Sequence, residues 1–227
     1  MSKLFDDLQE GLKQAIDYAD GSFDERDVTY KNESAVDFGN EQIKLNSNHL
    51  RILFIGNSHT YMNDLPAGVK TLAREEGYSC EVTMLAHGGW YLSEHADEPQ
   101  TRFNVMYGDY DYIVLQEHSH PFDRIDDYRS AVKNISSWAE KAGSRIVIFG
   151  TWARKDDKAS QDYMDKINRD IADKNGAILA PVGERWWSYI DECPDLELYD
   201  EDGAHASCAG TKFAAKVIWT SIKDSIK

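Results

Sequence analysis

Residues 51–56 read Arg51-Ile52-Leu53-Phe54-Ile55-Gly56, a run of apolar side chains that ends at a glycine. The run lacks the alternation of apolar and polar residues that is typical of a strand with one face in water. A short, continuous apolar run is typical of a strand buried on both faces, as in a parallel sheet that helices cover on either side. This segment therefore predicts a buried parallel strand.

Similar runs recur along the chain, with helical patterns between them. Strand-like runs lie at residues 80–85, 112–115, 146–149 and 177–180. Helical patterns cover residues 67–76, 92–107, 126–142, 160–174 and 208–226. Strands that alternate with helices of this length form right-handed βαβ units. We therefore predict an α/β fold, a flavodoxin-like three-layer α/β/α sandwich of about five parallel strands, with a ligand site at the carboxyl ends of the strands.

The beginning of the chain has a different composition. Residues 1–48 are acidic, and apolar side chains recur at helical spacing over residues 4–19, with Gly21 as a suitable C-cap. We predict an N-terminal extension over residues 1–48 with one amphipathic helix, and a second domain over residues 49–227. A helix with one apolar stripe has to bury it, either on the following domain or on a second subunit. A homodimer through this helix is thus one of two alternatives.

Charge limits the range of partners. The 227 residues include 25 Lys and Arg against 40 Asp and Glu, which gives a formal net charge of −15. Binding to a phosphate backbone needs clustered basic side chains, and the sequence has no such cluster. An acidic surface also disfavours anionic membranes. We expect neither a nucleic-acid partner nor a membrane partner.

Several features favour a cytoplasmic location. The first residues lack the apolar core of a secretory signal, and no apolar stretch approaches the length that crosses a bilayer. The three cysteines, Cys80, Cys193 and Cys208, are too few and too scattered for a disulfide framework. A reducing compartment fits this pattern.

The first candidate site follows directly from the opening strand. Gly56-Asn57-Ser58 places a hydroxyl side chain at the carboxyl edge of the sheet, where glycine allows a tight turn and free N–H groups can face an anion. A turn or helix-capping serine would give the same pattern.

A second candidate site precedes the last helix. Asp202-Gly203-Ala204-His205 lies in a loop that converges on the loop after the first strand. A serine nucleophile needs a base such as imidazole, and the imidazole needs an acceptor that fixes its tautomer and stabilises its cation. Asp202 could instead cap a helix, and His205 could be a satisfied surface histidine.

Together the two segments resemble the SGNH/GDSL hydrolases. Gly56-Asn57-Ser58 is similar to the first block of that family and Asp202-Gly203-Ala204-His205 to its last block, and their order and separation of 205 − 58 = 147 residues also match. The likeness covers about residues 50–226 and is greatest to a bacterial subgroup with Gly-Asn-Ser-His/Tyr-Thr in the first block. The resemblance implies the SGNH hydrolase fold for residues 49–227, Ser58 as nucleophile, His205 as base and Asp202 as its orienting partner.

The resemblance also implies an oxyanion hole. Besides the N–H of Ser58, family members use a glycine N–H after the second strand, a role that Gly88 or Gly89 can fill. After the third strand the family usually has Gly-x-Asn-Asp, whereas this chain has Leu115-Gln116-Glu117. The subgroup also has Leu-Gln-Glu here, so we expect the Gln116 amide to be the third donor.

Other residues near the predicted strand ends suggest what is bound. We take Asn57, Trp90, Trp152 and Arg154 as candidate substrate-binding residues, because a tryptophan can stack on a sugar or line an acyl pocket and Arg154 can hold a carboxylate. A tryptophan that plugs the end of the sheet is the alternative. His118 and His120 could be part of a metal site, but the carboxylates lack regular ligand spacing, and no nucleotide-binding motif occurs. We expect no metal and no organic cofactor.

These observations favour a serine hydrolase that cleaves small or carbohydrate-linked carboxylic esters through an acyl-enzyme. Its partner would be a small-molecule ester, with an acylated sugar as one candidate. An acyltransferase that uses the same triad is an alternative, as is a catalytically weak carbohydrate-binding protein on the same fold. A protein-pairing role of residues 1–48 is a third alternative.

Overall fold

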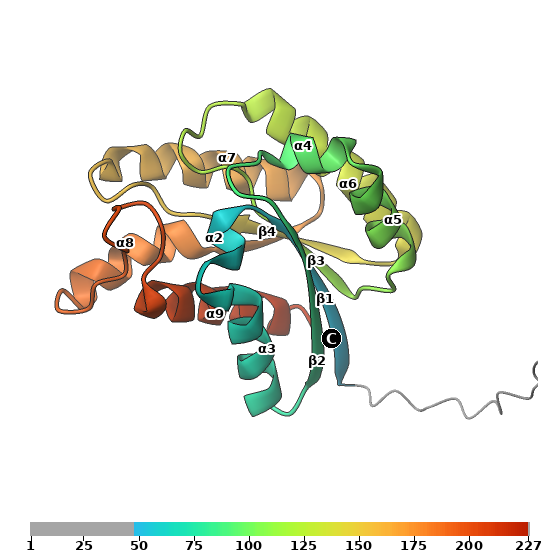
Figure 1. Ribbon diagram of the computed structural model, residues 1–227, viewed down its shortest axis with the longest axis horizontal. Helices are drawn as coiled ribbons and strands as arrows, with labels where there is room; N and C mark the ends of the chain where they lie inside the picture. Colours follow the sequence, from blue (N-terminus) through green and yellow to red (C-terminus); the bar gives the residue numbers. More distant parts are fainter. Residues whose placement is uncertain (1–47, 227) are drawn as a thin grey trace, which may run out of the picture. The chain divides into compact units, whose positions relative to one another are not determined.

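The computed structural model describes residues 48–226, which contain one parallel sheet of five strands in the order β2-β1-β3-β4-β5 (Figure 1). The strands are β1 (His49–Gly56), β2 (Ser79–Ala86), β3 (Tyr112–Leu115), β4 (Arg145–Gly150) and β5 (Ile178–Pro181). This order is the flavodoxin-like one, in which the first strand lies beside the switch point of the sheet. The predicted α/β/α fold class and strand number are therefore confirmed. The predicted N-terminal helix falls in residues 1–47, outside the described residues.

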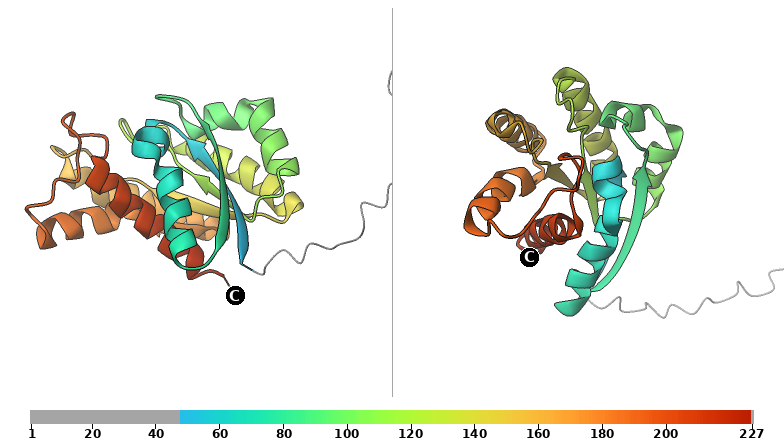
Figure 2. Two further views of the ribbon diagram at one scale, coloured as in Figure 1. Left: turned by 60° about the horizontal axis from the view of Figure 1, so that its bottom comes forward. Right: turned by 60° about the vertical axis from the view of Figure 1, so that its left-hand side comes forward.

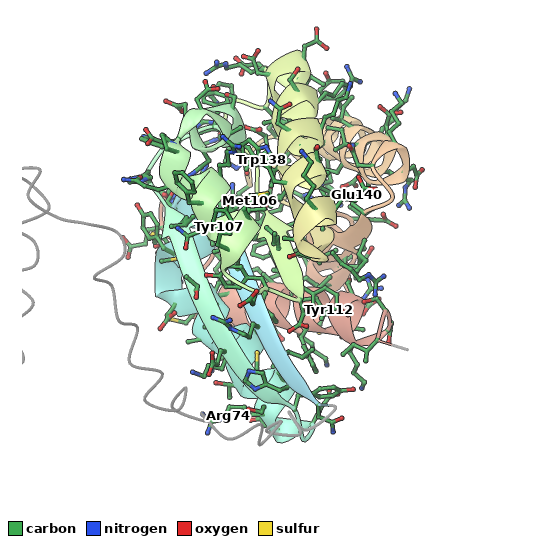
Figure 3. The ribbon with its side chains drawn as sticks, turned by 90° about the vertical axis from the view of Figure 1, so that its right-hand side faces the viewer. Arg74, Met106, Tyr107, Tyr112, Trp138 and Glu140 are labelled. Atoms are coloured by element: carbon green, nitrogen blue, oxygen red, sulfur yellow. The ribbon has the colours of Figure 1, made fainter. Side chains whose placement is uncertain are left out.

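The opening segment is the inner strand that the sequence predicts. Ile52, Leu53, Phe54 and Ile55 are completely buried, and β1 pairs with β2 on one side and β3 on the other. β2 is instead an edge strand in which every residue except Cys80 is exposed or partly exposed, and Figure 3 shows this side of the molecule.

Helices cover both faces of the sheet. Ile52 and Phe54 point toward a core shared with α3 (Leu65–Glu75), α8 (Val182–Glu192) and α9 (Cys208–Lys223). Leu53 and Ile55 point to the opposite core, shared with α4 (Leu92–Asp97), α5 (Pro99–Tyr107), α6 (Ile125–Ala142) and α7 (Gln161–Lys174). Because successive side chains of a strand point to opposite faces, one apolar run serves two cores.

Two helices differ from the sequence prediction. The predicted helix over 92–107 is divided into α4 and α5, because Glu98 is extended (φ −82°, ψ 126°) before Pro99. Proline disfavours the helical conformation in the residue that precedes it. Helix α8, which carries Trp186, is missing from the prediction because it begins directly after Pro181, with no loop to mark its start.

Four loops follow the ends of parallel strands, and a fifth leads into α9. Residues 57–64, 87–91, 116–124 and 151–157 follow β1 to β4, and residues 193–207 lead into α9. Figure 2 shows α3 and α9, which contact each other, from two further angles. Within residues 48–226, none of the helices combines the length and apolar character needed to cross a bilayer.

Truncation of Leu53 to alanine tests the burial of the inner strand β1. Leu53 is fully buried in β1, so we expect Leu53→Ala to lower the free energy of unfolding by about 2–5 kcal/mol. Leu196→Ala is the control, because Leu196 is 41% exposed, and its effect should stay within about 0.5 kcal/mol. Equal effects of the two variants in urea unfolding would contradict the burial of β1.

Candidate active site

Ser58 is the first residue of α2 (Ser58–Tyr61), directly after the turn that ends β1. Asn57 caps this short helix, because its Oδ1 accepts a hydrogen bond from the His59 N–H at 3.1 Å. The turn needs glycine at position 56, since a Cβ there would lie 2.4 Å from both the Gln116 Oε1 and the Thr60 Oγ1.

The structure brings Ser58, His205 and Asp202 together. The Ser58 Oγ lies 2.8 Å from the His205 Nε2, and the His205 Nδ1 lies 2.5 Å from the Asp202 Oδ2. Because the carboxylate accepts the Nδ1–H, the Nε2 of the neutral ring is left to accept the Ser58 hydroxyl proton. This geometry is that of a nucleophile, its general base and an orienting carboxylate.

Backbone donors fix the orienting carboxylate. The Asp202 Oδ1 accepts hydrogen bonds from the Ala204 N–H at 2.8 Å and the His205 N–H at 2.9 Å. The hydrogen bond from the His205 ring, supported by these two N–H groups, holds the pKa of Asp202 well below its ordinary value. Asp202 is therefore ionised at neutral pH and can stabilise a His205 cation.

Trp152 packs under the loop that carries His205 and donates a hydrogen bond to it. It is completely buried and stacks on Trp186 with ring centroids 4.0 Å apart. Its Nε1–H donates to the Ala204 carbonyl at 2.8 Å. The prediction that Trp152 contacts substrate is therefore wrong, and the alternative, a hydrophobe that plugs the end of the sheet, describes its position.

Gly88 and Gly89 lie beside Ser58 in a cavity of about 510 Å³, the site cavity, which Ser58 and His205 also line. They form the middle of a turn that the Trp90 N–H closes by donating to the His87 carbonyl at 3.2 Å, with Gly89 at φ +74°. Among residues 48–226, no acceptor binds the N–H of Gly88 or Gly89. Both remain candidate oxyanion donors with the Ser58 N–H.

Asn57 and Trp90 tie this turn to the nucleophile. The Asn57 Nδ2 donates to the Trp90 carbonyl at 2.9 Å. Asn57 borders the site cavity but is only 2% exposed, and both of its amide atoms are engaged. The Trp90 ring stacks on His87, with centroids 4.1 Å apart, and does not line the site cavity. Both side chains thus stabilise the turn, and of the two Asn57 also lines the site cavity.

Gln116 does not present a donor to the site cavity. Its Oε1 accepts from the Asn57 N–H at 2.8 Å and from the Thr60 hydroxyl at 2.9 Å, while its Nε2–H donates to the Glu117 carbonyl. The two donors at Oε1 fix the orientation of the amide, because the flipped amide would place NH₂ against them. Contrary to the sequence-based expectation, Gln116 braces the nucleophile turn.

Arg154 lies at the rim of the site cavity. Its Nη2 donates to the Asp202 carbonyl at 3.4 Å, and its Nε lies 3.2 Å from the Asp156 Oδ1. Its side chain is 43% exposed, so it can still meet a ligand. Of the four predicted substrate-binding residues, Asn57 and Arg154 line the site cavity, and Arg154 is the more exposed of the two.

Two further histidines, His59 and His120, lie near His205. The ring centroid of His59 lies 4.9 Å from that of His205 and 5.3 Å from that of His120. Burial lowers the pKa of His59 well below its ordinary value, and burial with the nearby Arg154 guanidinium lowers the pKa of His120 to about 4. In residues 48–226, no group of three or more His, Cys, Asp or Glu side chains is arranged to hold a metal ion.

Glu117 is a buried residue whose role sequence reasoning missed. Its Oε1 accepts from the His118 N–H at 2.7 Å and the Leu92 N–H at 3.4 Å, which joins the loops after β2 and β3. Burial raises the pKa of Glu117 to about 7. The available signal was a carboxylate two residues after the end of a buried strand.

A solved structure of known family shares this fold. A protein from Slackia heliotrinireducens, proposed to be an SGNH hydrolase, is 30% identical and superposes with a TM-score of 0.68, covering 77% of this chain and 100% of its own. This chain belongs to the SGNH hydrolases. The family resemblance in the sequence is thereby confirmed.

More distant structures share the SGNH hydrolase fold at low identity. A carbohydrate esterase family 3 protein from Talaromyces cellulolyticus is 12% identical, with a TM-score of 0.63 and coverage of 78% of this chain and 98% of its own. A catalytic mutant of an acetylxylan esterase from Geobacillus stearothermophilus is 14% identical, with a TM-score of 0.60 and coverage of 76% and 94%. No protein-family model and no curated protein sequence matches this SGNH hydrolase.

A double-mutant cycle tests the bracing role of Gln116. Gln116→Leu removes the acceptor of the Asn57 N–H and the Thr60 hydroxyl, and Thr60→Val removes one of these donors. We expect each to lower the free energy of unfolding by about 1–3 kcal/mol, with a coupling of at least about 0.5 kcal/mol in the double variant. Thr71→Val, whose hydroxyl contacts Ala67 on α3, is the control for additivity. Additive effects of Gln116→Leu and Thr60→Val would overturn the assignment.

The raised pKa of Glu117 predicts a pH-dependent stability. The folded state holds the proton that the unfolded chain loses near pH 4.5, so wild-type stability falls as the pH rises from about 4.5 to about 7. Glu117→Gln lacks this loss, so its stability relative to wild type should rise by up to about 3 kcal/mol over that range. Urea unfolding at several pH values checks this, with the exposed Glu140→Gln as control. A difference that stays constant with pH contradicts the prediction.

Proposed function

We propose that this SGNH hydrolase cleaves small or carbohydrate-linked carboxylic esters through an acyl-enzyme on Ser58. The observation that carries the proposal is the hydrogen-bonded chain from the Ser58 Oγ through the His205 ring to the Asp202 carboxylate. Membership in a hydrolase family and structural neighbours that are esterases support the same reaction class.

Acylation begins at the 2.8 Å contact between the Ser58 Oγ and the His205 Nε2. As Oγ attacks the ester carbonyl, its proton passes to Nε2, and the carbonyl electron pair moves onto oxygen. Collapse of the tetrahedral intermediate breaks the bond to the alcohol, whose oxygen takes the proton from His205. Ionised Asp202 stabilises the His205 cation between these two transfers.

Deacylation repeats the cycle with water. His205 removes a proton from a water molecule that attacks the acyl-enzyme, and then returns the proton to the Ser58 oxygen as the acid departs. The developing oxyanion is held by the backbone N–H of Ser58 and of Gly88 or Gly89. Each such donor contributes about 3–4 kcal/mol to transition-state stabilisation.

Acyl transfer to an alcohol other than water uses the same residues. Addition of an alcohol acceptor during turnover distinguishes the two reactions, because a transferase forms the new ester faster than the free acid. A binding protein on this fold would instead retain a sugar without any turnover. Both alternatives are compatible with the same hydrogen-bonded arrangement of Ser58, His205 and Asp202.

Substitution of the nucleophile is the direct test. We expect Ser58→Ala to lower hydrolysis of p-nitrophenyl acetate by at least about 10³-fold and Asp202→Asn by about 10⁴-fold, the latter because the His205 tautomer is no longer fixed. A fluorophosphonate probe should modify Ser58 in the wild type. Ser137→Ala, an exposed serine on α6, is the matched control. Undetectable turnover in the wild type, or full activity of Ser58→Ala, would refute the proposal.

A further inference from the structure

A second cavity adjoins the site cavity and has no part in the mechanism above. This side pocket has a volume of about 420 Å³, within the range of about 300–1,000 Å³ typical of small-molecule sites. Its lining includes His120, Phe122, Arg154, Asp157, Ser160 and Tyr163. These side chains come from the loops after β3 and β4 and from the start of α7.

The side pocket and the site cavity share part of their lining. Ser119, His120 and Arg154 line both cavities, whereas Gly88 and Gly89 line the site cavity alone. The side pocket therefore adjoins the part of the site cavity that Ser119, His120 and Arg154 line, and the candidate oxyanion donors take no part in it.

That shared lining lies on the side of the general base. The Arg154 Nη2 donates to the backbone carbonyl of Asp202, and the Asp202 side chain holds the His205 ring. In ester cleavage the general acid must reach the oxygen of the departing alcohol, so the alcohol lies on the imidazole side of the nucleophile. The alcohol half of the ester is thus directed toward the side pocket.

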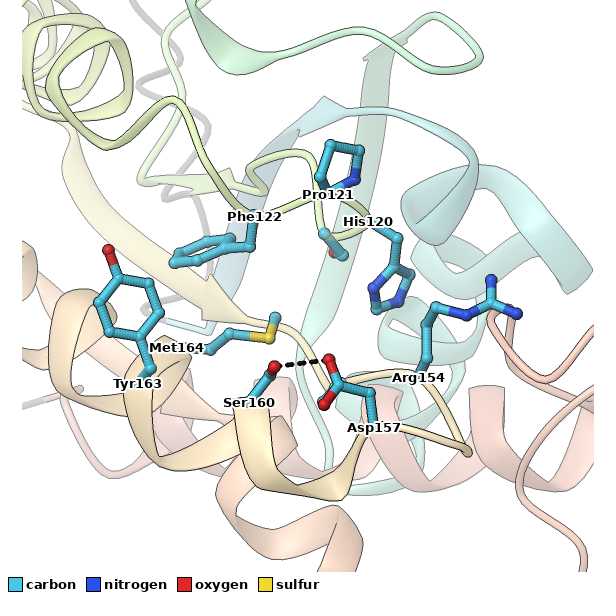
Figure 4. Close-up of a pocket in the computed structure, with 10 residues that line it drawn as sticks. His120, Pro121, Phe122, Arg154, Asp157, Ser160, Tyr163 and Met164 are labelled. Carbon is cyan, nitrogen blue, oxygen red and sulfur yellow. Dashed lines mark hydrogen bonds between the residues drawn. The ribbon is translucent and has the colours of Figure 1, made fainter.

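The lining of the side pocket combines rings with charged, hydrogen-bonding groups. Figure 4 shows Phe122 and Tyr163 at one end and His120 and Arg154 at the other. The Phe122 and Tyr163 rings meet edge to face with centroids 6.3 Å apart. Between the two ends, the Asp157 Oδ2 accepts a hydrogen bond from the Ser160 hydroxyl at 2.5 Å. Planar charged groups beside aromatic faces suit a ligand that is polar on its edge and apolar on its faces.

A long acyl chain fits this lining poorly. It would displace water from the Asp157 carboxylate and the Arg154 guanidinium without replacing the lost hydrogen bonds, which is costly for charged groups. Sugar hydroxyls can donate to the carboxylate and accept from the guanidinium, and the C–H face of a sugar ring can pack on Tyr163. We propose that the side pocket binds the alcohol half of the substrate as a polyhydroxylated ring, which makes the substrate an O-acylated sugar.

This inference rests on the proposed ester hydrolysis, so the test compares two esters of the same acid. The probes are 6-O-acetylglucose and ethyl acetate, which differ only in the alcohol. We expect the wild type to have a higher kcat/KM for the sugar ester, and the ratio of the two kcat/KM values to fall about tenfold or more in Asp157→Ala and in Tyr163→Ala.

A control variant and an acyl-chain series complete the experiment. Asp162→Ala removes an exposed carboxylate from the first turn of α7 that does not line the side pocket, so the ratio should keep its wild-type value. Tyr163 is 50% exposed, so Tyr163→Ala leaves the core packing intact and keeps the test valid if Asp157→Ala folds poorly. p-Nitrophenyl esters of increasing acyl length test the alternative that the acid half of the ester occupies the side pocket.

The outcomes separate the two proposals. Absence of Ser58-dependent turnover on either ester defeats the proposed function itself. Turnover that depends on Ser58, with a ratio that neither Asp157→Ala nor Tyr163→Ala changes, defeats the sugar pocket alone. A change in acyl-length preference in these variants would assign the side pocket to the acid half and also overturn the inference.

Discussion

The side-chain carbonyl of Gln116 connects the end of β3 to the turn after β1, and the position of Ser58 depends on that connection. It accepts from the Asn57 N–H and the Thr60 hydroxyl, and it occupies the space that a side chain at residue 56 would need. Asn57 in turn holds the carbonyl of Trp90. The turn that carries Ser58 is thus fixed by buried hydrogen bonds to two neighbouring strand ends, in a region where an unmet polar group would be costly.

The histidines near Ser58 differ in their electrostatic surroundings. His59 and His120 are kept neutral by burial, while Asp202 places a negative charge on the far side of the His205 ring. A second cation beside His205 would oppose the charge that this ring gains in the proposed proton transfer from Ser58. Burial of its neighbours removes that repulsion. The carboxylate then acts on the one imidazole that contacts the Ser58 hydroxyl.

Sequence patterns were most informative where backbone topology decides the outcome. The run at 51–56 predicted the buried inner strand β1, and parallel topology was enough to bring residue 58 close to residues 202 and 205, which are far away in sequence. The direction in which a side chain points was harder to predict from the sequence. Trp152 and Gln116 follow strand ends as expected, but hydrogen bonds to Ala204 and to the turn after β1 aim them inward. Such partners exist only in the folded chain, and the same holds for the burial that shifts the pKa of Glu117.

The separation of the reacting groups along the chain has a consequence for biosynthesis. The serine lies near the start of the sheet, whereas its base is on the loop that leads into α9, and α9 packs on α3. A ribosome delivers the chain from its amino end, so the first strand and the nucleophile emerge well before the base exists. In the proposed mechanism, the nascent protein therefore has no base for the Ser58 hydroxyl until residues 202–205 have been made, which is near the end of its synthesis.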